Sequence, residues 1–214
     1  MAAQPTVIVL AAGKGSRFDG GGHKLAQPLG SSSVLLATLA TAIASHLRVV
    51  VVTTPPFVDV ACSSIAARDV VVLPEVGSAG DIGLGMGASI AAGVRACPDS
   101  RGWLILPGDM PLVQPATLVA VARALDVHPV AYAQHLGRRG HPVGFAAELY
   151  SELTGLSGDE GARRLVARYP AFAVERDDPG ILVDIDTASD LAAVRRDAAA
   201  VALADARRAA LARG

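Results

Sequence analysis

A glycine-rich loop near the N-terminus has the residue types of a phosphate site. It reads Leu10-Ala11-Ala12-Gly13-Lys14-Gly15-Ser16-Arg17, followed by Phe18, a run of glycines and Lys24. Glycines let successive backbone amides approach phosphate oxygens, and Arg17 and Lys24 would add positive charge. The spacing matches neither G-x-G-x-x-G nor G-x-x-x-x-G-K-[ST], which weakens a dinucleotide or Walker-type interpretation. The alternative is an ordinary turn with two solvated cations.

A second candidate is Asp109, which stands between glycine and proline in Leu106-Pro107-Gly108-Asp109-Met110-Pro111. Mg2+ binds one or two carboxylates together with substrate phosphates, so a carboxylate fixed at a strand end suits it. Asp109 is therefore the leading metal ligand. The alternative is a turn in which this side chain bonds its own backbone.

Two further acids occur in Val183-Asp184-Ile185-Asp186-Thr187. Because they are two residues apart at the end of an expected strand, they should point to the same side. Either could approach a cation held by Asp109. Asp186 is the preferred second metal ligand, whereas Asp184 is better explained by a favourable interaction with the following helix dipole.

A basic segment, Arg138-Arg139-Gly140-His141-Pro142-Val143, lies in a region without clear periodicity and is expected to form a turn. It could meet a phosphate or another anionic part of a second substrate, and His141 is its candidate ligand contact. The alternatives are a structural turn histidine and a solvated arginine pair. The histidines lack helical metal spacing, which gives zinc little support.

The last candidate is a glycine run before a helix, Gly83-Leu84-Gly85-Met86-Gly87-Ala88-Ser89. Amides at a helix N-terminus can meet a base or a phosphate, which makes Gly85 and Ser89 candidate nucleotide contacts. The run could equally be a tight connection.

Composition limits the classes of partner. The 214 residues are 51% hydrophobic and only 4% aromatic, as expected for parallel strands covered by helices. A net charge of −1 without large basic patches indicates neither a nucleic acid nor a membrane partner.

Cys62 and Cys97 lack a metal or disulfide spacing and should be small buried hydrophobes. The apolar run from Thr6 to Ala12 is too short for a signal peptide or a membrane span, so we expect a cytoplasmic protein.

Apolar runs and stripes alternate along the chain. Strands are expected where apolar residues are continuous, at Thr6 to Ala12, Arg48 to Thr53, Asp69 to Leu73, Trp103 to Leu106, Val130 to Gln134 and Ile181 to Ile185. Helical stripes fall at Leu35 to Ile43, Ile90 to Val94 and Leu118 to Leu125.

Two sequence signals predict helix starts in the last third of the chain. Ser157 to Glu160 has the form of a capping box before a helix through Leu165, and Thr187 can cap a helix near Leu191. Gln134 to Gly158 should be an irregular insertion carrying substrate contacts.

This alternation predicts one α/β domain over residues 1–214, with a doubly wound, mainly parallel sheet and an Ala-rich helical tail at 194–214. Ligands of such sheets bind beyond the carboxyl ends of the strands.

Together these segments resemble the molybdenum cofactor cytidylyltransferases, within the wider MobA-like nucleotidyltransferase family that includes molybdopterin guanylyltransferases. The resemblance runs from Val7 to Val194 and rests on six motifs in the family's order. These are Leu10 to Lys24, Gly85 to Ser89, Gly108 to Pro111, Gly140 to Val143, Ser157 to Arg163 and Asp184 to Leu191. The L-A-A-G-x-G-x-R-F loop, GHPV and SGDEGAR are similar to the cytidylyl branch. One departure is that Lys24 lies seven residues after Arg17, whereas the family usually has five.

The resemblance implies a Rossmann-like nucleotidyltransferase fold of the GT-A type. It implies that a triphosphate is bound by Leu10, Ala11, Ala12, Gly13, Gly15, Arg17 and Lys24. It also implies Mg2+ on Asp109, with Asp186 as a second ligand, and catalytic roles for Arg17, Lys24 and Asp109.

The implied reaction is attack of a pterin cofactor's terminal phosphate on the α-phosphorus of CTP, releasing pyrophosphate, with a molybdoenzyme as a further partner. Alternatives are GTP as the donor, another phosphorylated acceptor such as a sugar phosphate, or a nucleotide-binding cofactor chaperone without chemistry.

Overall fold

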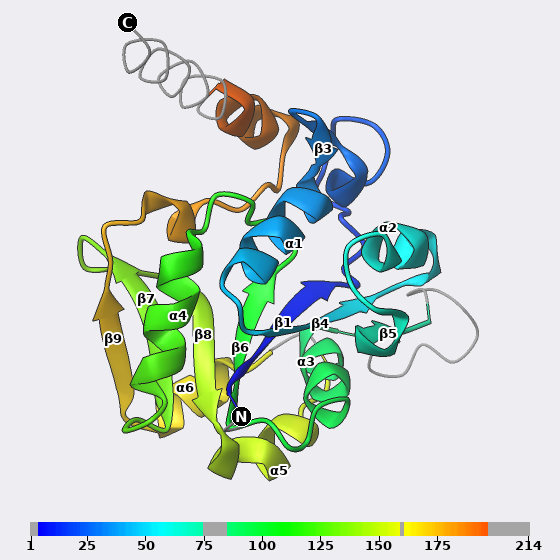
Figure 1. The fold of residues 1–214 in the computed structure, drawn as a ribbon. Coiled ribbons are helices and arrows are strands. Elements are labelled where there is room, and N and C mark those ends of the chain that lie inside the picture. Colours follow the sequence, from blue (N-terminus) through cyan, green and yellow to red (C-terminus); the bar gives the residue numbers. More distant parts are fainter. Residues whose placement is uncertain (1–3, 75–84, 159–160, 197–214) are drawn as a thin grey trace, which may run out of the picture.

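The fold is described from a computed structural model, which covers residues 4–74, 85–158 and 161–196. Its centre is a seven-stranded sheet with helices on both faces (Figure 1). The strands, in spatial order, are β5 (Val70–Val72), β4 (Arg48–Thr53), β1 (Thr6–Ala11), β6 (Gly102–Pro107), β8 (Arg138–Ala146), β7 (Val130–His135) and β9 (Ala171–Glu175). A two-stranded hairpin consists of β2 (Pro28–Leu29) and β3 (Ser32–Ser33).

Six helices have complete bounds within the described residues. They are α1 (Val34–Ala44), α2 (Val58–Cys62), α3 (Met86–Arg95), α4 (Pro115–Ala124), α5 (Tyr150–Thr154) and α6 (Arg163–Arg168). Short 3-10 turns occur at Lys24–Ala26, Pro55–Phe57, Ala67–Asp69, Ala147–Leu149 and Pro179–Leu182. A last helix covers residues 188–196. None of the helices in the described ranges is long and apolar enough to cross a membrane.

The sheet is mainly parallel, as predicted. β5, β4, β1 and β6 pair in parallel, and β9 is parallel to β7. Only β8 runs against its two neighbours, β6 and β7. The carboxyl ends of β1, β4 and β6 therefore meet at one edge of the sheet, where ligands of such folds bind.

Each face of the sheet has its own apolar core. Alternate residues of β1 point to opposite faces, so Val7 and Val9 join the core under α1 and α4, and Ile8 joins the core under α3, α5 and α6. Because helices cover both faces of the sheet, the central strands consist of continuous apolar runs. Trp103 on β6 is fully buried in the second core.

The region from Gln134 to Gly158, predicted to be irregular, is ordered structure, so that prediction is wrong. A turn at Leu136 and Gly137, both with positive φ (48° and 75°), reverses the chain into the nine-residue strand β8. β8 fills the space between β6 and β7, pairing from Ala146 to Val143 with β6. The basic segment at Arg138 is thus a strand and not a turn.

The strand predicted at Ile181 to Ile185 is also wrong. The chain instead forms a 3-10 turn at Pro179–Leu182. The buried Asp178 carboxylate accepts hydrogen bonds from the Gly180 and Gln114 amides and from the Thr117 hydroxyl, which fixes the turn beside the start of α4. The strand at the β7 end of the sheet is instead β9, which the sequence analysis did not predict.

Smaller predictions have mixed outcomes. Thr187 caps the last helix as expected, since its hydroxyl accepts from the Asp190 amide at 3.2 Å. The helix predicted through Leu165 is confirmed as α6, which begins after Ala162 without a side-chain cap. The end of the predicted capping box, 159–160, and the tail from 197 lie outside the described residues. Cys97 is buried, but Cys62 is exposed, so half of the cysteine prediction is wrong. β5 is an edge strand and only partly buried.

Candidate functional site

A cleft of about 830 Å³ opens at the carboxyl edge of β1 and β6. One wall is the segment after β1, residues 12–17, which we call the β1 loop, together with Lys24. The opposite wall is formed by the start of β8, on the far side of β6, and by α6. The start of α3 also lines the cleft and lies beside the segment before α6, since the Gly87 amide donates to the Gly158 carbonyl at 2.9 Å. The cleft brings together every predicted site residue except Ala11: Leu10, Ala12, Gly13, Gly15, Arg17, Lys24, Gly85, Ser89, Asp109, His141 and Asp186. Ala11 is buried in the core beneath α1 and does not line the cleft.

The shape of the β1 loop depends on glycines at close contacts. Gly15 has φ +60°, and its carbonyl accepts from the Phe18 amide at 3.0 Å to close a turn. Gly108, at the end of β6, donates its amide to the Leu10 carbonyl at 2.8 Å. A Cβ at Gly108 would come within 2.9 Å of that carbonyl oxygen. A glycine at this position therefore lets the end of β6 reach the start of the β1 loop.

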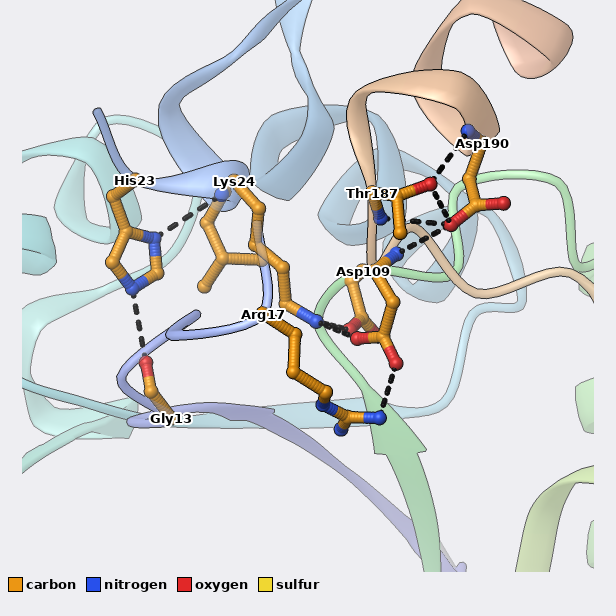
Figure 2. Close-up of polar contacts among 9 residues, drawn as sticks. Gly13, Arg17, His23, Lys24, Asp109, Thr187 and Asp190 are labelled. Atoms are coloured by element: carbon orange, nitrogen blue, oxygen red, sulfur yellow. Dashed lines mark hydrogen bonds and ion pairs between the residues drawn. The ribbon is translucent and has the colours of Figure 1, made fainter. Parts of the chain in front are cut away.

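The floor of the cleft holds two cations and two carboxylates in ionic contact (Figure 2). Lys24 Nζ lies 2.6 Å from Asp109 Oδ2 and 2.6 Å from Asp186 Oδ1. The second oxygen of Asp186 is 2.6 Å from Arg17 NH1. Lys24 and Asp109 are each only 13% exposed, whereas Arg17 is 79% exposed. The ammonium group of Lys24 thus occupies a cation position between two carboxylates.

The two neighbouring carboxylates raise the pKa of Lys24. Burial acts to lower the pKa of the ammonium group, but the attraction of Asp109 and hydrogen bonds to Asp109 and Asp186 outweigh burial, so the pKa is raised. Lys24 is therefore charged in the folded protein at neutral pH. Losing either carboxylate would leave a mostly buried cation with one partner fewer.

Asp186 reaches this position without a strand beneath it. The amide of its neighbour Ile185 donates to the Asp109 backbone carbonyl at 3.1 Å, which ties the two acid-bearing segments together. On the other side, the Asp190 carboxylate accepts from the Asp186 and Thr187 amides at 3.2 and 2.8 Å. Thr187 and Asp190 cap each other and so fix the approach of Asp186 to the cleft.

The two carboxylates fit a hard divalent cation. Asp109 Oδ1 is buried and has no hydrogen-bond partner among the described residues, so it is available as a ligand. No group of three or more potential metal ligands occurs in the described parts of the chain. A cation here would complete its shell with water and substrate phosphate oxygens, the usual manner of Mg2+.

The opposite wall is rich in positive charge. Arg138, Arg139 and Arg163 line it, and within the described ranges none of them forms an ion pair with a carboxylate. The guanidinium of Arg139 lies 4.8 Å from the centre of the Tyr132 ring, a cation–π contact that orients it. This wall can accept an anionic group directly.

His141 lies on the same wall, next to Arg139 on β8. Its Nδ1 is buried and lacks a partner among the described residues. Burial lowers the pKa of His141, which hydrogen bonding to the Ile105 backbone and the charge of Asp109 only partly oppose. Asp184 also lines the cleft but joins no ion pair within the described residues.

Two residues of this region were missed by the sequence analysis. His23 lies within the longer spacing between Arg17 and Lys24 and was given no role, yet its Nε2 lies 2.9 Å from the Gly13 carbonyl. Arg163 was part of the SGDEGAR motif without an assigned role, and it lines the cleft opposite the β1 loop. A single histidine or arginine carries no local signal of such a position, because the contact is made by the fold.

Comparison with known proteins gives a consistent result. The family model described as MobA-like NTP transferase domain matches residues 7–174. Purine catabolism protein PucB of Bacillus subtilis (strain 168) is 34% identical over 197 residues, which are 88% of this chain and 95% of PucB. Among solved structures, a nucleotidyl transferase from Methanothermobacter thermautotroptrophicus, Mth528, has a TM-score of 0.74 at 28% identity, covering 91% of this chain and 97% of Mth528. A manganese complex of Rv0371c from Mycobacterium tuberculosis H37Rv has a TM-score of 0.71 at 27% identity, covering 92% of this chain and 100% of that one.

Proposed function

This chain belongs to the MobA-like NTP transferase domain family and is a nucleotidyltransferase, and we propose that it transfers CMP from CTP to the terminal phosphate of a molybdopterin-type cofactor with Mg2+. The observation that carries the proposal is the cation position between Asp109 and Asp186, directly below the β1 loop. A triphosphate held by that loop would have its phosphates beside these two acids.

The bond changes are those of an in-line substitution. An oxygen of the acceptor's terminal phosphate forms a bond to the α-phosphorus of CTP, and the bond from that phosphorus to the β-phosphate bridging oxygen breaks. Pyrophosphate leaves with the electron pair, and no covalent intermediate on the protein is needed. Such reactions depend on positioning and on stabilising charge, which are the tasks of this chain's residues.

The two walls of the cleft divide those tasks. With the triphosphate present, Lys24 and Arg17 exchange carboxylate partners for phosphate oxygens and offset the charge of the leaving pyrophosphate. Asp109 and Asp186 would hold the divalent cation, which supplies further positive charge to the phosphates. The manganese bound in the related Rv0371c structure supports a metal-dependent reaction.

Arg138, Arg139 and Arg163 would bind the acceptor phosphate on the opposite wall. Arginine suits this role because its planar guanidinium donates two parallel hydrogen bonds to one phosphate. The GHPV and SGDEGAR motifs of the resemblance contribute residues to this wall, which supports a pterin cofactor as the acceptor.

The test is a matrix of CTP, GTP, ATP and UTP against molybdopterin, a sugar phosphate and no acceptor, with pyrophosphate release measured with Mg2+ and with EDTA. The proposal expects release with CTP and molybdopterin only, abolished by EDTA. Preference for GTP, or for the sugar phosphate, contradicts the proposed donor or acceptor but leaves nucleotidyl transfer intact. Nucleotide binding without release under any condition would favour a cofactor chaperone.

A further inference from the structure

His23 contacts the β1 loop through the backbone carbonyl of Gly13. Its ring nitrogen Nε2 lies 2.9 Å from the Gly13 carbonyl oxygen, and Nδ1 lies 3.2 Å from the Leu25 amide (Figure 2). The ring also packs against Phe57, with centroids 4.6 Å apart. His23 does not line the cleft, whereas Gly13 and Lys14 do.

The two hydrogen bonds fix which nitrogen of His23 carries the proton. A ring nitrogen that accepts from a backbone amide cannot itself be protonated, so Nδ1 is bare. The proton of the neutral ring is then on Nε2, and Nε2 donates to the Gly13 carbonyl. His23 thus acts as a donor to the loop and as an acceptor for the N-terminal cap of the Lys24–Ala26 turn.

The direction of the Gly13 carbonyl determines the direction of the next amide. In a trans peptide, the carbonyl of one residue and the N–H of the following residue point in opposite directions. Because the Gly13 carbonyl points toward His23, the Lys14 N–H points away from His23, and Lys14 is a residue that lines the cleft. A flipped peptide would turn a carbonyl oxygen toward the triphosphate and remove an amide donor.

Side-chain packing does not restrain the Gly13 peptide within the described residues. Gly13 lacks a side chain, and a Cβ at this position would meet nothing within 4 Å. At Gly15 a Cβ would lie 3.3 Å from His23 Nε2, so the ring lies close to both glycines of the loop.

We infer that His23 is a positioning residue for the triphosphate, whose Nε2–H keeps the Gly13 carbonyl turned away so that the Lys14 amide faces the phosphates. This inference rests on the proposed function in one respect, that the β1 loop binds a triphosphate. It goes further by assigning a role to a residue that does not touch the substrate.

Two variants separate the two hydrogen bonds of His23. His23→Gln places an amide nitrogen at the position of Nε2, so it keeps the donor to Gly13 and loses the cap of Leu25. His23→Asn places a carbonyl oxygen at the position of Nδ1, so it keeps the cap and loses the donor. Both remove the ring from Phe57, which matches them for lost packing.

The measurements are the KM and kcat for CTP and the Kd of inorganic triphosphate by calorimetry, with Tm recorded for each variant. If the competent peptide orientation falls to about a tenth of the population, apparent affinity falls about tenfold. We therefore expect His23→Asn to raise the CTP KM and the triphosphate Kd about tenfold with an unchanged acceptor KM. His23→Gln should stay within about twofold of the wild-type values.

The inference would be overturned if the two variants had equal CTP KM values. It would also be overturned if the changes in KM and Kd paralleled the loss of Tm and not the loss of the hydrogen-bond donor to Gly13. Wild-type protein that fails to bind inorganic triphosphate overturns it as well, together with the loop assignment. If wild-type protein binds triphosphate but releases no pyrophosphate with any nucleotide, the proposed function fails while the calorimetric comparison of the variants still decides the role of His23.

Discussion

The two walls of the cleft differ in how their charges are balanced. On the β1-loop wall, Lys24 and Arg17 are already paired with Asp109 and Asp186. On the β8 wall, the described residues contain no ion pair from Arg138, Arg139 or Arg163 to a carboxylate. The first wall must therefore exchange partners when a ligand binds, whereas the second can receive an anion without giving up a contact. Substitutions should accordingly have different kinetic signatures on the two walls.

The largest effect is expected from Asp109→Asn, which keeps the size of the side chain and removes its charge. Loss of one group that stabilises transition-state charge typically reduces kcat by about 10²- to 10³-fold, and this acid would also lose its role toward the cation. The kcat is measured as the rate of pyrophosphate release at saturating CTP and acceptor, and the Tm of the variant shows whether it is folded.

Asp184→Asn is the matched control, because Asp184 lines the same cleft without joining the described ion pairs. It should retain activity within about threefold of wild type, since uncoupled surface changes are small. Equal losses from the two variants would contradict a special role for Asp109.

A second test replaces Lys24 with Met, which has a similar length and no charge. We expect kcat to fall about 10²-fold because a phosphate-directed cation is lost. In the absence of nucleotide, however, Mn2+ should bind more tightly than to wild type, since Asp109 and Asp186 no longer have Lys24 between them. Electron paramagnetic resonance titration of free Mn2+ measures this, and weaker Mn2+ binding would show that Lys24 does not occupy the cation position.

The third test concerns the β8 wall. Arg139→Ala should raise the acceptor KM about 10- to 100-fold, because a hydrogen bond to a charged group contributes about 1.5 to 3 kcal/mol. The CTP KM should stay nearly constant, which is the signature that separates the walls. Arg123→Ala, an exposed residue of α4 that does not line the cleft, is the control and should change neither KM. A rise in the CTP KM instead would place the nucleotide on this wall.

The smallest effect is a pH dependence of stability from His141. Because burial lowers the pKa of His141, the unfolded chain takes up a proton near the ordinary pKa of 6.5, whereas the folded chain takes it up only at a lower pH. The unfolded state then binds more protons, so the free energy of unfolding decreases as pH falls below 6.5. Wild-type Tm should drop more than the Tm of His141→Gln between pH 7.5 and 5.5. Parallel curves for the two proteins would contradict this expectation.

The sequence by itself determined the β1-loop wall and its supporting strands. The apolar runs at β1, β4 and β6 are buried on both faces, so their hydrophobic pattern is local and strong. Gly13, Gly15 and Asp109 follow such runs directly, and parallel strands bring their carboxyl ends to one edge. Placement of Asp109 below the loop was therefore predictable without coordinates.

Only the tertiary structure decided the β8 wall and the contacts of the ionic cluster. β8 exists because the space between β6 and β7 accepts an antiparallel strand, and its glycine- and arginine-rich sequence has no periodicity that predicts one. Lys24 and Asp186 are in contact although they are 162 residues apart in the sequence. The strand predicted before Asp186 is not formed, and Asp186 is positioned by the hydrogen bond from Ile185 to the Asp109 carbonyl and by the cap at Thr187. Local sequence patterns determine the individual helices and strands. Which distant side chains meet around one cation position depends on how these elements pack together, and the spacing of residues along the chain does not contain that information.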